Sequence, residues 1–265
     1  MNRTIEISAV AFAIAVFILI ACWHLKLPGL QFDECLGAAP AVAFLIGSQT
    51  PPMQIEPSIV YIFGRPLPMM VMPYIGPVKT ILHIAVYSIF GISVETTRLM
   101  PIALMVCALI FLYIAVRKFS DMPNAIIATL LMSVNSAMVF YLTRDAGPAA
   151  FALFSAAMLL FFSVQWLSGK NVLPLIGFFA GLGVSHKADF LWFVASSGFA
   201  FAWVYRPTLS FRDGSVLAVA FIVGALPLIA FNVATAGMTG KMAAAKFSLA
   251  GLPSAFTVRC AQLFQ

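Results

Sequence analysis

The chain is a succession of apolar runs, each long enough or nearly long enough to cross a lipid bilayer. The first extends from Ile5 to Leu27 and exceeds the roughly 20 residues that a helical crossing requires. Across the chain, 62% of residues are hydrophobic and only 9% are charged, whereas a soluble domain carries about 25% charged residues. A soluble fold could not cover its surface with so few charges. The sequence therefore predicts an all-α integral membrane protein, a polytopic helical bundle.

The first run is interpreted as a retained helix and not as a signal peptide. It is longer than the roughly 7–15 apolar residues of a signal core, and no A-x-A-like cleavage site leads into a soluble sequence. Further crossings are predicted at Pro101–Val116, Asn124–Leu142, Pro148–Leu167, Val172–Val184, Ala188–Tyr205 and Ser215–Ala234. The total is about seven spans.

The predicted span Val172–Val184 is short for a crossing and contains three glycines, at positions 177, 181 and 183. Small residues allow two helix backbones to approach closely inside a membrane. We therefore expect this helix to be tilted, or to pack tightly against its neighbours.

The basic residues of the short connections predict the orientation of the chain. They fall on alternate connections, at Arg3, Arg117, Lys118, Lys170, Arg206 and Arg212. Because lysine and arginine in short loops favour the cytoplasmic side, the amino terminus is predicted to be cytoplasmic, in a bacterial inner (plasma) membrane. Residues 29–95 and the connections near 143–147, 186–187 and 235–265 are then on the outer face.

The first outer segment, 29–95, is rich in apolar positions although it is predicted to be a loop. Glu34–Ile46 and Val78–Phe90 are each predicted to form a short amphipathic helix that lies in the membrane interface and does not span it. Proline and methionine dominate the sequence between them, which predicts an ordered but irregular loop. Residues 1–234 would thus form a transmembrane module, and 235–265 a second outer loop that is incomplete.

Charges of both signs gather on the predicted outer face. The acids are Asp33, Glu34, Glu56, Glu95, Asp145 and Asp189, and the bases are Lys79, Arg98, Arg144, Lys187, Lys241, Lys246 and Arg259. Taken singly, each could be an interfacial side chain that reaches toward water. Taken together, they predict a polar site at the outer membrane surface.

The composition argues against several other classes of site. The four cysteines form no C-x-x-C pair, so neither a zinc site nor a disulfide framework is indicated. His83 and His186 are expected to be interfacial polar groups and not ligands, and no cofactor is expected. The net charge of +6 is spread over loop ends, which disfavours nucleic acid as a partner and favours an anionic lipid.

The order of these features resembles the amino-terminal half of a known family. An acidic pair, Asp33-Glu34, follows the first span, and the run YIGPVK from Tyr74 to Lys79 precedes Arg98-Leu99 at the second span. Arg144-Asp145 follows the third span, and Gly181 to Lys187 closes the fifth. This set resembles the membrane glycosyltransferases of the C superfamily, especially the protein mannosyltransferase and aminoarabinose transferase branch. Members are usually much longer, so the chain is expected to be either a truncation or a minimal version.

The resemblance implies transfer of a sugar from a polyprenyl-phosphate carrier to an unidentified acceptor hydroxyl on the outer face. By resemblance Asp33 is the candidate general base, and Glu34 supports it or contacts the acceptor. Cationic side chains would stabilise the departing phosphate; the candidates are Lys79, Arg98, Arg144 and Lys187. Asp145 would orient one of these bases or bind sugar hydroxyls, and Tyr74 would stack on the sugar or donate a hydrogen bond. The branch does not uniformly require a metal.

Simpler roles stay open for several of these residues. Arg144-Asp145 could be a local ion pair that ends a helix, Lys187 an interfacial lysine, and Tyr74 a residue of the aromatic belt. Two other functions compete with transfer. One is a non-catalytic lipid-binding or assembly subunit, and the other is a small transporter, which the absence of charged residues in mid-span disfavours.

Overall fold

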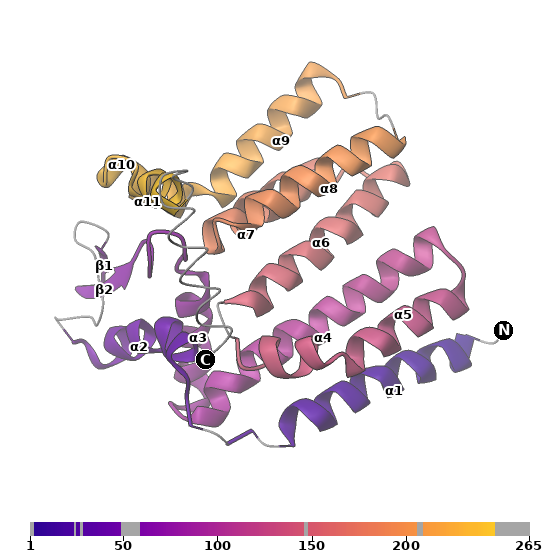
Figure 1. The fold of residues 1–265 in the computed structure, drawn as a ribbon, viewed down its shortest axis with the longest axis horizontal. Coiled ribbons are helices and arrows are strands. Elements are labelled where there is room, and N and C mark those ends of the chain that lie inside the picture. The colour runs from indigo at the N-terminus through magenta and orange to yellow at the C-terminus, as the bar shows by residue number, and fades with distance from the viewer. Residues whose placement is uncertain are drawn as a thin grey trace, which may run out of the picture.

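The computed structural model describes residues 3–23, 25–26, 29–48, 59–145, 148–205 and 209–246. Within these ranges the chain is almost entirely helical, which confirms the predicted fold class (Figure 1). Three residues with a predicted place lie outside the described residues: Glu56, Arg206, and Arg259 with the rest of segment 247–265.

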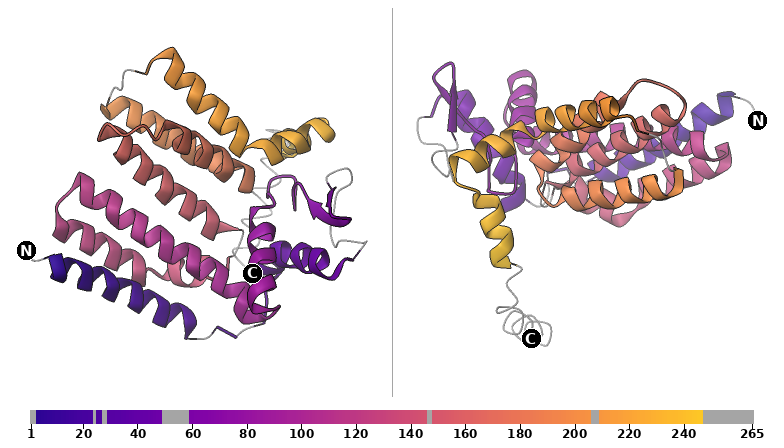
Figure 2. Two further views of the ribbon diagram at one scale, coloured as in Figure 1. Left: turned by 180° about the vertical axis from the view of Figure 1, so that it is seen from behind. Right: turned by 90° about the horizontal axis from the view of Figure 1, so that it is seen from above.

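Seven helices lie side by side and form the bundle (Figures 1 and 2). They are α1 (Arg3–Cys22), α4 (Val94–Phe119), α5 (Met122–Val134), α6 (Ala149–Leu167), α7 (Leu173–His186), α8 (Phe190–Tyr205) and α9 (Phe211–Gly224). The start of α1 lies at one end of the bundle, and α2 and α3 lie at the other. The predicted site residues are therefore gathered at the end away from the amino terminus.

Three of the described helices, α1, α4 and α6, are long and apolar enough to cross a membrane, and α9 with α10 (Leu226–Ala234) adds a fourth if this bent pair is one span. Helices α5, α7 and α8 are apolar but have only 13, 14 and 16 residues. Large apolar side chains are exposed along the bundle, as expected where lipid is the solvent. The chain is an integral membrane protein.

Two of the predicted spans are not straight helices. The third breaks at Asn135, whose side-chain oxygen accepts a hydrogen bond from the Ala137 N–H at 3.0 Å, and a π-helical turn η1 (Ala137–Leu142) continues the path. An asparagine side chain that binds nearby backbone competes with the helical ladder. The seventh bends by 65° between α9 and α10, so α10 leaves the bundle at the end where α2 and α3 lie.

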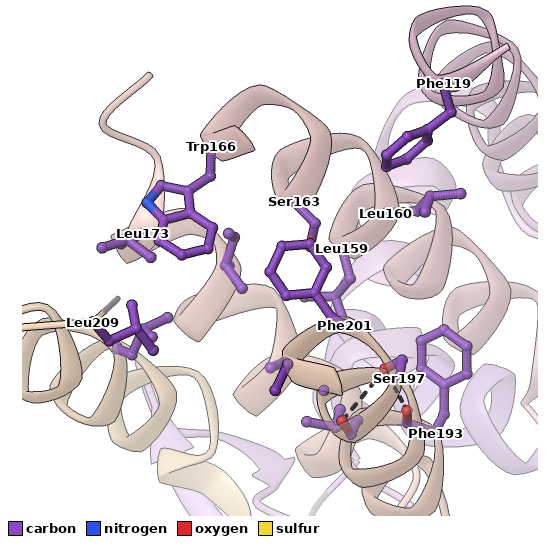
Figure 3. Close-up of a pocket in the computed structure, with 16 residues that line it drawn as sticks. Phe119, Leu159, Leu160, Ser163, Trp166, Leu173, Phe193, Ser197, Phe201 and Leu209 are labelled. Carbon is purple, nitrogen blue, oxygen red and sulfur yellow. Dashed lines mark hydrogen bonds between the residues drawn. The ribbon is translucent and has the colours of Figure 1, made fainter. Parts of the chain in front are cut away.

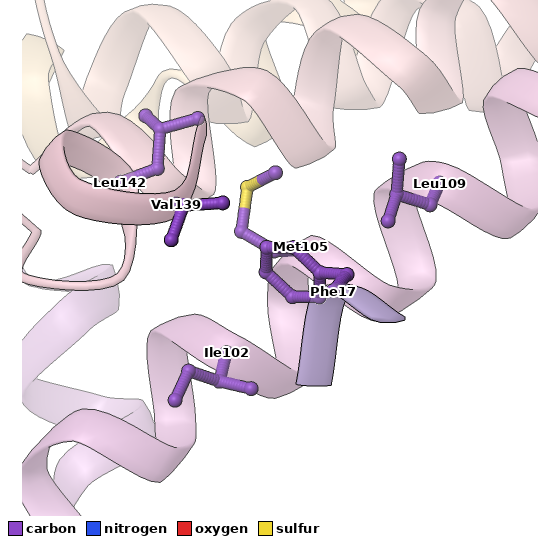
Figure 4. Packing of buried hydrophobic residues seen from close by; sticks show 6 residues of the cluster. All are labelled: Phe17, Ile102, Met105, Leu109, Val139 and Leu142. Atoms are coloured by element: carbon purple, nitrogen blue, oxygen red, sulfur yellow. The ribbon is translucent and has the colours of Figure 1, made fainter. Parts of the chain in front are cut away.

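The bundle has two buried apolar clusters. One joins α1, α4 and η1 through Phe17, Ile102, Met105, Leu109, Val139 and Leu142 (Figure 4). The other joins α6, α7 and the start of α8 through Leu159, Ala180, Val184 and Phe190. Together they fix the helix ends that carry the polar residues.

Glycines bring α7 and α9 into direct backbone contact, as the sequence predicted for this short span. A Cβ atom at Gly181 would lie 2.0 Å from the Phe221 carbonyl oxygen, and one at Gly177 would lie 2.5 Å from that of Leu217. Neither position could hold a larger residue without separating the helices.

At the site end of the bundle, α2 (Phe32–Ile46) and α3 (Val78–Phe90) match the two short helices predicted for the outer segment. The prediction of an irregular loop between them is wrong for residues 59–68. There, β1 (Ile59–Ile62) and β2 (Arg65–Pro68) form an antiparallel hairpin. Helix α11 (Met238–Lys246) follows α10 at the same end (Figure 1).

Candidate active site

The acidic pair lies in the first turn of α2. Gln31 precedes the helix in an extended conformation, and its N–H donates to Glu34 Oε2 at 2.8 Å as part of a capping box. Carboxylates are favoured here because the free N–H groups of a helix start carry partial positive charge. Asp33 is half-buried, whereas Glu34 is only 2% exposed. The two neighbours therefore face different environments.

Glu34 forms a bidentate ion pair with Arg98 of α4. Arg98 Nε lies 2.7 Å from Glu34 Oε1, and Nη2 lies 3.0 Å from Oε2. The guanidinium also donates to the carbonyl oxygens of Leu25, at 2.6 Å, and Gly29, at 3.1 Å. Arg98 is 1% exposed. It thus ties α4 to α2 and to the connection between α1 and α2.

Lys79 and Asp145 form a second buried ion pair. Lys79 Nζ lies 2.7 Å from Asp145 Oδ2 and also donates to the Asp33 carbonyl oxygen at 2.9 Å. The stem of Lys79 passes over Gly37, where a Cβ atom would lie 2.6 Å from its Cγ and Cδ. This pair joins α3 to the loop before α6 and fixes the backbone of Asp33.

Asp145 is held in a strained, fully engaged position. Its φ is 47°, a left-handed conformation that is uncommon outside glycine, and its Oδ1 accepts the Ala150 N–H at 3.1 Å. Burial alone would raise the pKa of Asp145, but the Lys79 ammonium and these hydrogen bonds outweigh it and lower that pKa overall. The ion pair with Lys79 thus favours the ionised form of Asp145.

Arg144 lies beside both ion pairs. It is half-buried. Burial lowers its pKa, the Arg98 guanidinium lowers it further, and the Glu34 carboxylate partly opposes them. Even so, a guanidinium retains its charge in proteins. The loop before α6 therefore holds a cation within electrostatic range of the acidic start of α2.

Tyr74 and Lys187 lie on two segments that run together. Ile75 and Lys187 form an isolated antiparallel bridge, the Gly76 N–H donates to the His186 carbonyl at 2.9 Å, and the Ala188 N–H donates to that of Tyr74 at 3.0 Å. Lys187 Nζ lies 3.7 Å from Asp189 Oδ2, and both side chains are partly exposed. Unlike Lys79 and Arg98, Lys187 can thus reach a ligand without breaking a buried pair.

The structure brings six of the predicted residues into one connected cluster, namely Asp33, Glu34, Lys79, Arg98, Arg144 and Asp145. Tyr74 and Lys187 lie on the adjoining paired segments. Among the described residues, no group of three His, Cys, Asp or Glu side chains could hold a metal ion.

Both histidines of this region are buried, so the expectation that they are interfacial polar groups is wrong. His186 Nε2 lies 3.2 Å from the Pro148 carbonyl oxygen, and the ring meets Phe151 edge-on. His83 Nδ1 lies 3.0 Å from the Lys79 carbonyl oxygen. Their isolated positions in the sequence gave no signal of burial, because part of each environment comes from residues distant in the sequence, Thr97 for His83 and Pro148 with Phe151 for His186.

The burial of His83 predicts a pH-dependent stability. Burial, reinforced by the Lys79 charge, lowers the pKa of His83 to about 4, against about 6.5 in an unfolded chain. Between these pH values the unfolded chain binds a proton that the folded protein does not, so stability falls as the pH falls. By pH 5 this difference in proton binding by His83 lowers the free energy of unfolding by about 2 kcal/mol.

The measurement is the thermal unfolding midpoint in detergent at pH 7.5 and pH 5, for the wild type and His83→Asn. Asparagine can still donate to the Lys79 carbonyl but does not titrate, so the variant should lose less stability on acidification than the wild type. All other titrating groups are common to both proteins. Equal losses would show that His83 does not carry the effect.

Two apolar cavities follow the inner faces of α4, α6 and α8. One, of about 310 Å³, lies between α6, α7 and α8 and is lined by residues that include Leu159, Ser163 and Trp166 (Figure 3). The other, of about 360 Å³, extends to Met105 and Leu153, and the two share Leu160, Phe193 and Ser197. Met105 lies about two helical turns along α4 from Arg98. The apolar space thus extends toward the charged cluster.

One comparison with known proteins decides the family. The dolichyl-phosphate-mannose-protein mannosyltransferase family matches residues 75–235, more than half of the 265 residues. The chain belongs to this family. No curated protein and no solved structure matched the chain.

Membership confirms the resemblance drawn from the sequence. The chain is a membrane glycosyltransferase of the C superfamily. The matched range contains Lys79, Arg98, Arg144, Asp145 and Lys187, and it begins directly after Tyr74 but 41 residues after Glu34, so Asp33 and Glu34 lie outside it. All four candidate cations thus lie within the part of the chain that the family shares.

Proposed function

We propose that this glycosyltransferase takes its sugar from a polyprenyl-phosphate carrier and transfers it to an acceptor hydroxyl on the outer face of the membrane. The observation that carries the proposal is a charged cluster together with an apolar space that extends to Met105, about two turns of α4 from Arg98. Arg144 and Lys187 supply cations at the helix ends, and the cavities along α4 and α6 supply an apolar path. A polyprenyl phosphate needs cations to bind its phosphate and an apolar space to hold its hydrocarbon chain.

In the proposed reaction Asp33 accepts the proton of the acceptor hydroxyl while the oxygen attacks the anomeric carbon. The bond from that carbon to the phosphate oxygen breaks, and the phosphate leaves with the electron pair. Arg144 and Lys187 stabilise the charge that develops on the phosphate. Tyr74, on the segment paired with Lys187, is in reach of the sugar.

The two buried ion pairs favour a positioning role for the remaining candidates. Arg98 and Lys79 already bind carboxylates inside the protein, at 2.7 Å each. Drawing either cation away would leave a buried carboxylate without its partner, which is costly. Glu34 and Asp145 are best described as the anchors that hold these cations and, through Lys79, the Asp33 backbone.

The test is donor binding and turnover by the purified protein in nanodiscs. The probe is polyprenyl-phosphate mannose, chosen because the family name contains mannose. Arg144→Gln should weaken binding about tenfold, the loss of one charge-assisted hydrogen bond. Arg212→Gln is the matched control, because Arg212 is an exposed arginine in the first turn of α9, far from the cluster.

Binding with turnover supports the proposal. Binding without turnover with any hydroxyl acceptor would favour the non-catalytic lipid-binding subunit. Absence of binding, or equal loss in both variants, would overturn the carrier assignment.

A further inference from the structure

A group of polar side chains lies at the end of the bundle opposite the candidate active site, where α1 begins and α4 ends (Figure 1). The Tyr113 hydroxyl donates to Glu6 Oε1, and Arg117 Nε lies 3.1 Å from the same oxygen. The Glu6 side chain is 24% exposed and that of Arg117 is 42% exposed. An ion pair this close to the surface contributes little to stability, and the proposed reaction does not use it.

An apolar groove of about 450 Å³ begins at this polar group and follows α1 and α4. Ile7 and Ala11 are exposed, so the groove opens on the outer surface of the bundle. It extends to Ile14, which lies about 12 Å along the helix from Glu6. The groove therefore extends away from residues 1–2 and toward the middle of the two helices. Its apolar lining consists of Ile7, Val10, Ala11, Ile14 and Ile110.

The groove faces lipid, because both helices that form it are long and apolar enough to cross the membrane. Hydrocarbon chains fill the surface grooves of a spanning helix, since the bilayer core holds no water. A phospholipid with an acyl chain in this groove has its headgroup at the end of the helices, at the level of Glu6 and Arg117. The chemistry of the headgroup therefore decides which lipid these charges favour.

We propose that the groove binds a zwitterionic phospholipid whose headgroup carries a phosphate and a primary ammonium, as in phosphatidylethanolamine. The Arg117 guanidinium binds the phosphate, for which its planar fork of donors is suited. Glu6 accepts a hydrogen bond from the ammonium, because a carboxylate has about four lone-pair sites, more than its contacts with Tyr113 and Arg117 use. A quaternary ammonium, as in phosphatidylcholine, has no N–H to donate. This site does not depend on the proposed reaction.

The test is native mass spectrometry of the full chain in detergent with an equimolar mixture of phosphatidylethanolamine and phosphatidylcholine that have the same acyl chains. The wild type should retain phosphatidylethanolamine about fivefold over phosphatidylcholine, the value of one hydrogen bond. Glu6→Gln keeps the shape of the side chain but removes its charge, so it should remove most of this preference. Glu95→Gln is the matched control, because Glu95 pairs with the exposed Lys26 near the other end of the bundle. It should keep the preference of the wild type.

Two further variants separate the phosphate contact from the groove. Arg117→Gln should lower the retention of both lipids alike, since both carry the phosphate, and Ala11→Phe should do the same by filling the groove. Unchanged thermal midpoints confirm that the variants keep the fold. Equal retention of the two lipids by the wild type, or a preference that persists in Glu6→Gln, would overturn the proposal. A dimer that Ala11→Phe disperses, with no lipid retained, would also overturn it, because the groove would then hold a second copy of the chain.

Discussion

Asp33→Asn is expected to abolish sugar transfer while leaving donor binding and the helical bundle intact. Asparagine has nearly the same shape as aspartate but cannot accept the proton of an attacking hydroxyl, and loss of a general base costs on the order of 10²- to 10⁴-fold in rate. The Asp33 carbonyl oxygen accepts the hydrogen bond from Lys79 Nζ at 2.9 Å. That contact involves the backbone, so the substitution leaves it in place.

The measurement is the initial rate of mannosyl transfer by the purified protein, with donor affinity determined in parallel. Glu95→Gln is the matched control, because Glu95 is a carboxylate near the start of α4 whose partner, Lys26, is largely exposed. A transfer rate that Asp33→Asn leaves unchanged would remove Asp33 from the role of base. A loss of donor binding in the same variant would instead indicate that the carboxylate acts in binding.

The apolar runs of the sequence predicted the helices well because run length and hydropathy are local properties. Helices α6 and α8 follow the predicted ranges to within a few residues. The break at Asn135 and the bend after Gly224 were not predicted, because both residues lie inside runs that are apolar enough on average to be assigned as single spans. The hairpin was not predicted because prolines, here Pro66 and Pro68, usually indicate a loop and not a strand. In the structure they occupy the strand positions that need no N–H.

The residues of the cluster could be proposed from the sequence, but their partners could not. Glu34 and Arg98 are 64 positions apart in the sequence. Lys79 lies on α3, and its partner Asp145 lies in the loop before α6. No periodicity links such residues. Asp145 was expected to orient one of the bases or to bind sugar hydroxyls, without an indication that the base would be Lys79, and Glu34 was expected to support Asp33 or contact the acceptor and not to pair with Arg98. Pairing separates the fully engaged cations, Lys79 and Arg98, from Lys187, which lies at the surface with a looser partner.

Arg98→Met is expected to destabilise the folded protein by about 3–5 kcal/mol, because it leaves the Glu34 carboxylate buried without a countercharge. Glu34 is 2% exposed and accepts two hydrogen bonds from the guanidinium, at 2.7 and 3.0 Å. Arg98→Lys keeps the charge but not the bidentate geometry, so its loss should be smaller. The measurement is the thermal unfolding midpoint in detergent.

The double variant Glu34→Met with Arg98→Met separates a structural pair from two independent ligands. Replacing both members of a buried ion pair by apolar residues of similar size often costs little, so the double variant should be more stable than Arg98→Met alone. Residues more than about 7–10 Å apart usually show additive effects, and additive losses here would contradict the pairing. Transfer should stay impaired even in the stable double variant, because the link from α4 to the start of α2, next to Asp33, is lost. Recovery of stability without recovery of transfer would therefore identify the pair as the support that positions the base.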